Sequence, residues 1–219
     1  MLNKSNKNHS VTLFILSMIS LVFVLSMATF AKVYAAEKGD WLLRFGAVQV
    51  SPDDSSGTLS GAPTVGVAVD SDTQAFANIS YMLKNNVALE LLAATPFTHT
   101  ISATGALSGD IATVKQLPPT LSLQYRFSPK ATIVPYVGAG INYTMFFDEQ
   151  ATAVITSISL KDSWGLALQA GADIDMGNNW FANVDVRYIN IETTATTNLG
   201  TVDVKINPWV FSAGVGFKF

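Results

Sequence analysis

Seven ionisable residues of this chain each stand between two apolar neighbours, and this spacing limits the chemistry they can do. They are Arg44, Glu90, Arg126, Asp173, Asp185, Arg187 and Lys218. Because successive side chains of a β-strand point to opposite faces, each charge would lie on the face opposite an apolar row. Carboxylates and guanidiniums enclosed together must pair, since an unpaired buried charge is costly. The pattern predicts a cluster of ion pairs with a structural role.

Residues suited to catalysis are scarce. Apart from one histidine near the N-terminus, the chain has only His99, with Ser102 and Asp110 nearby in sequence. A serine–histidine–aspartate triad requires a fixed geometry, which a loop after a strand does not promise. The chain has no cysteine, so it has neither disulfides nor a thiolate nucleophile. We expect no enzymatic activity.

Metal and cofactor sites are also poorly supported. No pair of histidines is available for a metal site after the N-terminal segment. Two acidic pairs, Asp53-Asp54 and Asp70-x-Asp72, could hold a cation weakly, but a solvated acidic loop is the better account. We expect no cofactor and no metal.

The N-terminus has the order of a secretory signal peptide. Basic residues precede an apolar run over residues 11–30, which the small residues Ala31, Ala35 and Ala36 follow. We predict a signal peptide over residues 1–35, cleaved after Ala35. A cut after Ala31 is the weaker option, and an uncleaved membrane anchor is the alternative, because twenty apolar residues could span a bilayer.

The composition is not typical of a water-soluble domain or of a nucleic-acid-binding protein. Charged residues make up 13% of the chain, about half the share of an average soluble domain. Cleavage would remove Lys4, Lys7 and Lys32 and leave 10 of the 13 basic residues against 16 acidic ones, a net charge of −6. No basic run could hold phosphates, so nucleic acid is not an expected partner.

Eight segments with period-two alternation follow, separated by Gly, Asn, Asp, Ser and Pro clusters. They cover residues 40–50, 73–83, 87–93, 119–127, 133–146, 163–174, 180–191 and 209–219. About 9–11 residues suffice for a tilted strand to cross a bilayer. Connections are short after the second, fourth and sixth segments and long after the others, as in bacterial barrels. Residues 36–219 are predicted to be all-β: an eight-stranded antiparallel transmembrane β-barrel with short periplasmic turns and long extracellular loops.

Energetics choose which face points outward. In lipid every backbone N–H and C=O must be paired internally, so a sheet can span only as a closed barrel. An arginine facing lipid near the midplane would cost about 2–4 kcal/mol, so the charges must point inward. Aromatic residues near the ends of the apolar rows are expected to form interfacial girdles: Trp41, Tyr81, Tyr125, Phe127, Trp164, Trp180, Tyr188 and Trp209. A soluble lipocalin-type barrel is the alternative, but it gives these aromatics and Phe219 no purpose.

Five blocks in this order resemble the OmpW family of outer-membrane proteins, which includes the AlkL proteins. They are LLAATPF (91–97), GDIATVKQLPPTLSLQYRF (109–127), PYVGAGINYTMFFDE (135–149), LKDSWGLALQAG (160–171) and NPWVFSAGVGFKF (207–219). The resemblance covers nearly all of residues 37–219. It implies a narrow, largely hydrophobic channel toward the outer side and passage of small hydrophobic molecules. Some members serve as bacteriocin receptors, so a structural or surface-receptor barrel is the alternative function.

The inner surface is predicted to have two parts. An eight-stranded barrel is about wide enough for side chains to fill, so the seven charges would form a plug that blocks axial flow. Nearer the outer end, Leu92, Pro96, Gly138 and Gly140 could line a pocket for an alkyl chain or an aromatic ring, or merely fill the lumen. A plug below such a pocket would send cargo sideways into lipid.

Proline positions also allow two interpretations. Pro118 and Pro119 precede a predicted strand, a position that spares ladder hydrogen bonds. In a barrel wall the missing N–H groups could instead create a side opening. The strand-start interpretation is favoured.

The chain end and the expected surroundings complete the prediction. The resemblance implies that Phe219, with Phe217 and Phe211, is a signal read by the barrel-assembly machinery, although these residues also fit an ordinary apolar strand face. Expected partners are outer-membrane lipid and lipopolysaccharide, small hydrophobic molecules, the assembly machinery, and a bacteriocin or phage. The expected location is the Gram-negative outer membrane, with the signal peptide removed.

Overall fold

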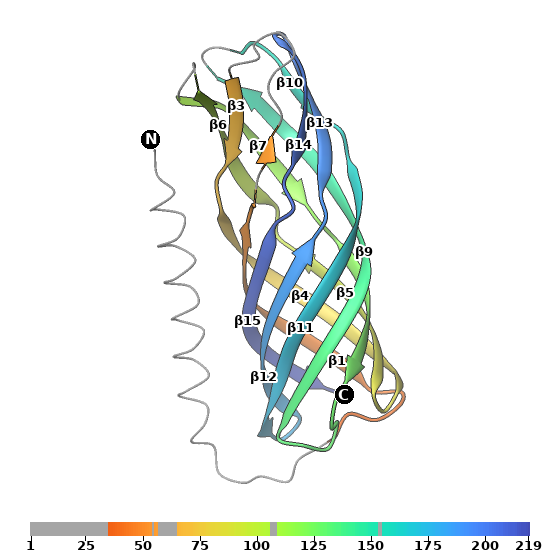
Figure 1. The fold of residues 1–219 in the computed structure, drawn as a ribbon. Coiled ribbons are helices and arrows are strands. Elements are labelled where there is room, and N and C mark those ends of the chain that lie inside the picture. Colours follow the sequence, from red (N-terminus) through yellow and green to blue (C-terminus); the bar gives the residue numbers. More distant parts are fainter. Residues whose placement is uncertain (1–34, 54, 57–64, 106–108, 153–154) are drawn as a thin grey trace.

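The fold was obtained as a computed structural model (Figure 1). It describes residues 35–53, 55–56, 65–105, 109–152 and 155–219. All of the predicted signal peptide except Ala35 lies outside these ranges. Within them there is no helix long and apolar enough to cross a membrane.

Eight strands form a closed antiparallel barrel. They are β1 (Trp41–Ser51), β4 (Asp72–Lys84), β5 (Val87–Ala94), β8 (Thr120–Arg126), β9 (Ile133–Ala151), β11 (Ser163–Gly177), β12 (Trp180–Ile189) and β15 (Trp209–Lys218). Each pairs with the next in this order, and β15 pairs with β1 to close the ring. The predicted eight-stranded barrel is confirmed, with every strand in its expected segment.

The barrel wall turns its apolar residues outward. Along β8, Leu121, Leu123 and Tyr125 are exposed while Ser122 and Gln124 between them are buried. Leu123 is 52% exposed although its partners across the ladder, on β5 and β9, are apolar too. Such a continuous apolar surface is suited to hydrocarbon and not to water.

Aromatic rings gather in two belts at the ends of this apolar surface. The belt beside the short turns and the C-terminus contains the pairs Trp41–Tyr81 (4.8 Å between centroids), Tyr125–Phe127 (5.0 Å) and Trp180–Phe217 (5.2 Å). The belt at the other end contains Tyr143–Trp164 (4.6 Å) and Tyr188–Trp209 (5.2 Å). These belts mark the two membrane interfaces.

Short turns close the periplasmic end. Asn178 and Asn179, between β11 and β12, both have positive φ, at 54° and 68°. A two-residue hairpin turn of this kind matches the twist of the flanking strands, and asparagine tolerates it better than most residues.

The long connections at the opposite end are strands and not the loops that were expected. They form β2 (Ser55–Ser56), β3 (Val65–Val69), β6 (Phe97–Gly105), β7 (Gly109–Leu117), β10 (Ile158–Leu160), β13 (Glu192–Thr197) and β14 (Gly200–Lys205). One group, β3-β6-β7, joins the upper part of β9, and the other forms a separate sheet, β10-β13-β14-β2. We call these strands and upper β9 the outer extension, which prolongs the barrel in Figure 1.

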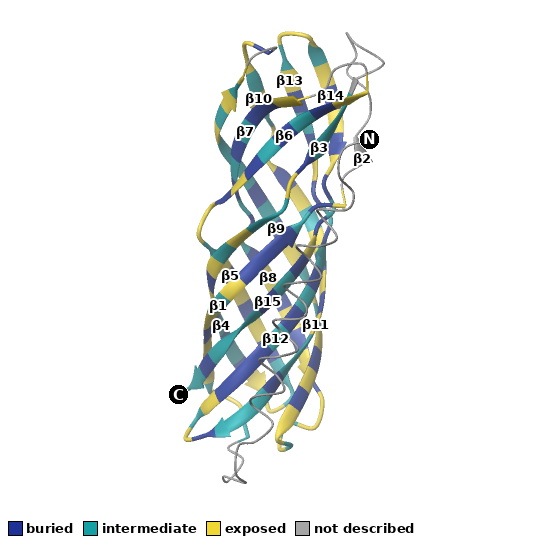
Figure 2. Ribbon diagram, turned by 90° about the vertical axis from the view of Figure 1, so that its left-hand side faces the viewer, coloured by how far each residue is buried: buried dark blue, intermediate teal, exposed yellow. Residues whose placement is uncertain are grey.

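The outer extension reverses the polarity of the barrel. Along β6 the buried residues are Phe97, His99, Ile101 and Ala103, and the exposed Thr98 lies between the first two. Buried and exposed residues still alternate along the strands above the barrel (Figure 2). Polar side chains therefore face outward here, as expected where water surrounds the wall.

The change of polarity coincides with interruptions in the strands. Strand pairing is interrupted between barrel and extension after Ser51 and at residues 70–71, 95–96, 118–119, 161–162, 190–191 and 206–208, whereas β9 runs through without a break. A break allows a strand to change which residues face inward, because an uninterrupted strand keeps strict alternation.

One matched pair of substitutions tests this two-part wall. Leu123→Arg places a charge on the lipid face and should lower the free energy of unfolding by about 2–4 kcal/mol. Thr98→Arg adds the same side chain to the outer face of the extension and should change it by less than about 0.5 kcal/mol. Urea titration in lipid vesicles measures both, and equal losses would contradict the assignment of lipid and water to the two regions.

Candidate functional site

Buried charges meet inside the lower barrel in an ion-pair network. Arg44 on β1 contacts Asp173 on β11 (Nη2–Oδ2 2.7 Å) and Glu90 on β5 (Nη1–Oε2 3.3 Å). Arg126 on β8 shares the same Asp173 oxygen at 2.7 Å. Of these four strands only β5 and β8 are neighbours in the sheet, and none of the three ion pairs joins neighbouring strands. The pairs therefore tie the wall together across the lumen.

A second branch continues from Glu90. Arg187 on β12 donates to Glu90 (Nη2–Oε1 2.6 Å) and to Asp185 (Nε–Oδ1 2.7 Å). The Tyr136 hydroxyl donates to the other Asp185 oxygen at 2.9 Å. The network contains three guanidiniums and three carboxylates, so its formal charges balance.

Neutral groups complete the network. Ser80 and Asn78 accept hydrogen bonds from Arg44, and Gln124 donates to Glu90 at 2.8 Å. Such contacts are the condition for tolerating buried charges, and they satisfy part of the plug's polar atoms, while Arg126 Nε and Nη1 and Arg187 Nη1 have no partner among the described residues. We call the six charged residues and these partners the plug.

Lys218 does not belong to the plug, contrary to the prediction. Its Nζ donates to the Ala35 carbonyl at 2.7 Å and lies 3.7 Å from Asp40 at the periplasmic mouth. The alternation along β15 correctly predicted that Lys218 points inward. It could not predict its position along the barrel axis, which is the periplasmic end because Lys218 is the last residue of β15. A small apolar cluster of Ala36, Leu42, Met82, Ala88 and Phe181 is buried at the same end of the barrel.

Above the plug the inner surface becomes apolar. A continuous cluster of buried side chains begins with Val48, Leu92, Ala167 and Val210 in the barrel and extends to Val202 in the outer extension. The lumen is thus divided into a charged lower part and a mainly apolar upper part, in which Thr120, Asn142 and Thr144 are buried polar residues.

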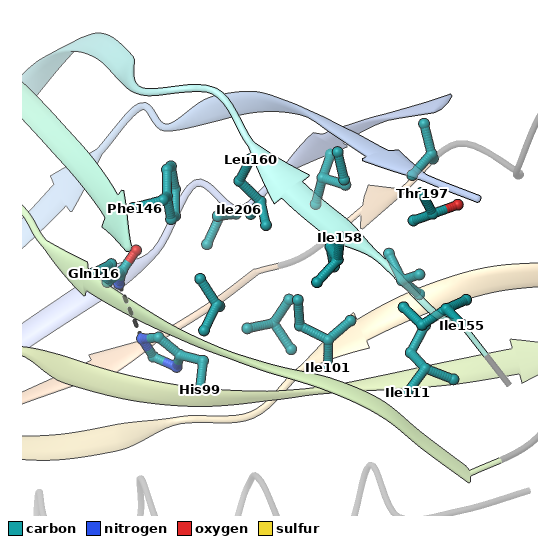
Figure 3. Close-up of a pocket in the computed structure, with 16 residues that line it drawn as sticks. His99, Ile101, Ile111, Gln116, Phe146, Ile155, Ile158, Leu160, Thr197 and Ile206 are labelled. Atoms are coloured by element: carbon teal, nitrogen blue, oxygen red, sulfur yellow. Dashed lines mark hydrogen bonds between the residues drawn. The ribbon is translucent and has the colours of Figure 1, made fainter. Parts of the chain in front are cut away.

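The upper part contains a cavity within the outer extension (Figure 3). The free room between its side chains is about 30 Å³, close to the volume of one water molecule, so a larger guest must displace side chains. Thirteen of its sixteen lining residues are apolar, and the other three are His99, Gln116 and Thr197.

Of the four residues predicted to line the channel, one contributes to the apolar lumen. Leu92 is buried in the apolar cluster, below the cavity. Pro96 is exposed in the break between β5 and β6. Gly138 and Gly140 are paired with Gln124 and Ser122, so their surroundings are polar.

The two glycines also do not leave room for cargo. A Cβ on Gly140 would lie 2.2 Å from the Leu121 carbonyl, and one on Gly138 would lie 2.7 Å from the Gln169 amide. They permit close packing of the wall. Strand tilt sets the height of each residue in a barrel, and this height cannot be read from alternation along one strand.

The residues that form the cavity were missed because their segments were taken as loops. A signal for them exists in residues 97–103, where Phe97, His99, Ile101 and Ala103 alternate with hydroxyl residues. That pattern is typical of a strand with an apolar inner face.

The residues weighed for catalysis and metal binding have other partners. His99 bonds to the Asp70 carbonyl and to Gln116, while Ser102 Oγ donates to Asp110 at 2.8 Å. Carboxylate oxygens of Asp70 and Asp72 accept backbone N–H groups of β6. Among the described residues no three His, Asp or Glu side chains gather as a metal site, and Asp54 lies outside them.

The predicted assembly residues lie on the outer surface of β15 and just after it. Phe219 exchanges two backbone hydrogen bonds with Trp41, and its ring stacks on Phe217 at 6.4 Å. Phe211 lies farther up, paired with Gln49 and Val186. Phe217 and Phe219 are accessible at the periplasmic belt, whereas Phe211 lies in the half of the barrel nearer the outer belt.

A closed eight-stranded barrel with a lipid-facing apolar wall, two aromatic belts and enclosed charges defines an outer-membrane β-barrel protein. Known proteins identify its type. The model of the OmpW family matches residues 37–219, and the chain belongs to this family. The location is the Gram-negative outer membrane.

Individual relatives support the assignment to this family. The chain is 44% identical over 209 residues to outer membrane protein W of Vibrio cholerae, covering 90% of this chain and 96% of that one. It is 33% identical over 199 residues to outer membrane protein AlkL of Ectopseudomonas oleovorans, covering 86% of each. A dibenzothiophene metabolism operon protein, PahQ of Pseudomonas aeruginosa, is 30% identical over 192 residues, covering 84% of this chain and 90% of that one.

Among solved structures, the crystal structure of outer membrane protein OprG from Pseudomonas aeruginosa has a similar fold. The TM-score is 0.80 with 40% sequence identity, over 84% of this chain and 98% of that one.

We expect the loss of a buried ion pair in the plug to lower the free energy of unfolding much more than the loss of an exposed ion pair. Arg44→Met would leave Asp173 and Glu90 each short of a partner and should lower the free energy of unfolding by about 3–5 kcal/mol. Lys115→Met removes an exposed partner of Asp148 (3.0 Å) and should cost at most about 1 kcal/mol. Urea unfolding in the same vesicles compares them, and a loss for Arg44→Met as small as that for Lys115→Met would show that the network is not structural.

Proposed function

We propose that this protein is a narrow passive conduit through which small hydrophobic molecules cross the outer leaflet. The observation that carries the proposal is the apolar inner surface, which extends from the cavity in the outer extension down to Leu92 and Ala167. With thirteen apolar residues among the sixteen that line the cavity, this wall offers few partners to an ion or a sugar.

The strength of binding suits a conduit. Burial of apolar surface contributes about 25 cal/mol per Å², so a molecule that buries about 200 Å² gains about 5 kcal/mol before the cost of immobilising it. Such binding would be weak and reversible. A molecule could leave the cavity as readily as it entered.

The plug makes a straight route to the periplasm unfavourable. Passage would require separating Arg44, Glu90, Asp173 and Arg187, whose contacts of 2.6–3.3 Å close the lumen. We therefore propose that cargo leaves sideways into the outer leaflet, through the wall above the plug.

A gap in the strand ladder supports a position for this exit. Pairing of β5 with β8 ends at Leu92–Thr120, and pairing of β6 with β7 starts at Phe97–Gln116. The intervening residues include Pro96, Pro118 and Pro119, which have no N–H to donate. The wall therefore lacks ladder hydrogen bonds beside Leu92, at the lower end of the apolar lumen.

One relative supports the class of cargo. The name of PahQ places it in an operon of dibenzothiophene metabolism, and dibenzothiophene is a flat apolar heterocycle. A barrel that admits compounds of this class would serve such an operon, and the same chemistry fits the cavity of this chain.

The surroundings of the barrel are part of the proposal. Lipid and lipopolysaccharide would contact the exposed apolar wall, and Phe217 and Phe219 at the chain end would be read by the assembly machinery. A bacteriocin or phage would meet the rim of the outer extension first.

Leu92 provides the direct test of transport. Leu92→Arg should reduce uptake of an apolar solute such as naphthalene at least tenfold, because it puts a charge in the apolar path. Thr98→Arg carries the same change outside the lumen and should leave uptake unchanged. Heat-modifiable migration on gels checks that both variants fold, and uptake is measured in cells that produce each one.

Undiminished uptake by a folded Leu92→Arg barrel would remove Leu92 from the path. Uptake that does not depend on the protein at all would favour the alternative, a surface receptor without transport.

Pro118 tests the side exit. The variant Pro118→Val restores an N–H donor to the gap, so the wall should close and naphthalene uptake should fall about fivefold or more. Binding of naphthalene in the cavity should persist, as shown by shifts of the Ile101 and Ile111 methyl resonances. Uptake equal to that of the natural chain would place the exit elsewhere.

A further inference from the structure

Two polar side chains interrupt the apolar wall of the cavity at one place. His99 on β6 is 2% exposed and Gln116 on β7 is 1% exposed, and both line the cavity. Because buried polar groups are nearly always hydrogen-bonded, the partners of each atom decide what this pair can offer to a ligand.

The hydrogen-bond donors and acceptors of the pair follow from one carbonyl. His99 Nδ1 lies 2.8 Å from the Asp70 carbonyl oxygen, which can only accept, so Nδ1 carries the proton. The neutral ring then has an acceptor at Nε2. Gln116 Nε2, 2.9 Å away, must donate to it.

This orientation leaves the Gln116 carbonyl oxygen without a partner. Oε1 is buried and has no hydrogen-bond partner among the described residues. It lies on the side of Gln116 turned away from His99 (Figure 3). An acceptor in a cavity whose other walls are apolar favours a ligand that brings a donor.

The pair is held in place before any ligand arrives. The Phe97 ring stacks on His99 with centroids 6.3 Å apart and planes 20° apart, and the Asp70 carbonyl fixes the imidazole from the other side. Gln116 lies opposite Phe97 in the β6–β7 ladder. The acceptor therefore has a set position, which is what selective recognition requires.

We propose that the cavity selects amphiphiles: molecules with an apolar body and one O–H or N–H donor that binds Gln116 Oε1. This rests on the proposed function, since it names the cargo class of the same cavity. Pure hydrocarbons would enter but leave the acceptor unpaired, and a site built to pair a donor discriminates against the analogue that lacks it.

The test compares 1-naphthol with naphthalene, which share one ring system and differ by the hydroxyl. Each is titrated into the folded barrel in detergent micelles while the methyl resonances of Ile101, Ile111 and Ile155 are followed. The quantity compared is the naphthalene midpoint divided by the 1-naphthol midpoint. Partition into micelles affects this ratio equally in every variant.

Gln116→Met removes the acceptor at nearly constant volume, and it is made together with His99→Phe because the single change would free the Nε2 acceptor of His99 for the same donor. The combined change should lower the ratio about fivefold, the size expected for one net neutral hydrogen bond. Gln150→Met, an exposed position on β9, should leave it unchanged. A ratio in the double variant equal to that of the natural chain, with naphthalene still binding, would overturn this inference and leave the conduit proposal standing. If neither compound shifts the methyl resonances of the natural chain, the proposed conduit fails as well.

A measurement on the natural chain covers the case in which the double variant does not fold. 1-Methoxynaphthalene has the same oxygen without its proton. The Gln116 side-chain amide resonances should shift with 1-naphthol and much less with 1-methoxynaphthalene. Equal shifts would overturn the inference.

Discussion

Backbone groups in hydrocarbon have no water to bond, and this constraint shapes the whole lower half of the molecule. The sheet must close on itself, which β15 achieves by pairing with β1. Closure leaves one face for lipid and one for a lumen about as wide as the side chains that fill it. Since the outer face must be apolar, polar and charged residues can be placed only inside.

Charges inside so narrow a lumen are stable only as a connected set. Arg44, Glu90, Asp173 and Arg187 come from four strands and are held within 2.6–3.3 Å of their partners, so each compensates another that would otherwise be isolated. The same contacts that stabilise the barrel also obstruct it. A structural need of the membrane-embedded part therefore limits the routes that remain for a solute.

Beyond the outer aromatic belt the solvent changes, and the wall changes with it. Water on the outside allows hydroxyl residues to face outward and apolar ones to face inward, so the outer extension has an apolar cavity where the barrel has charges. A hydrophobic molecule arriving from water meets this apolar interior first. His99 and Gln116 are the polar exception, and a polar pair kept in an apolar wall is the kind of feature that gives a pocket selectivity.

The sequence alone determined the eight crossing strands, their antiparallel order, the outward apolar face and the enclosure of six charges, because alternation and segment length are local properties of the chain. It indicated Leu92 as inward and apolar for the same reason. Only the tertiary structure decided which inward residues share a level: strand tilt places Gly138 and Gly140 beside glutamine and serine, and Lys218 below the plug. It also turned the presumed loops into the outer extension, since short strands with polar outer faces are recognisable only once their partners pair with them.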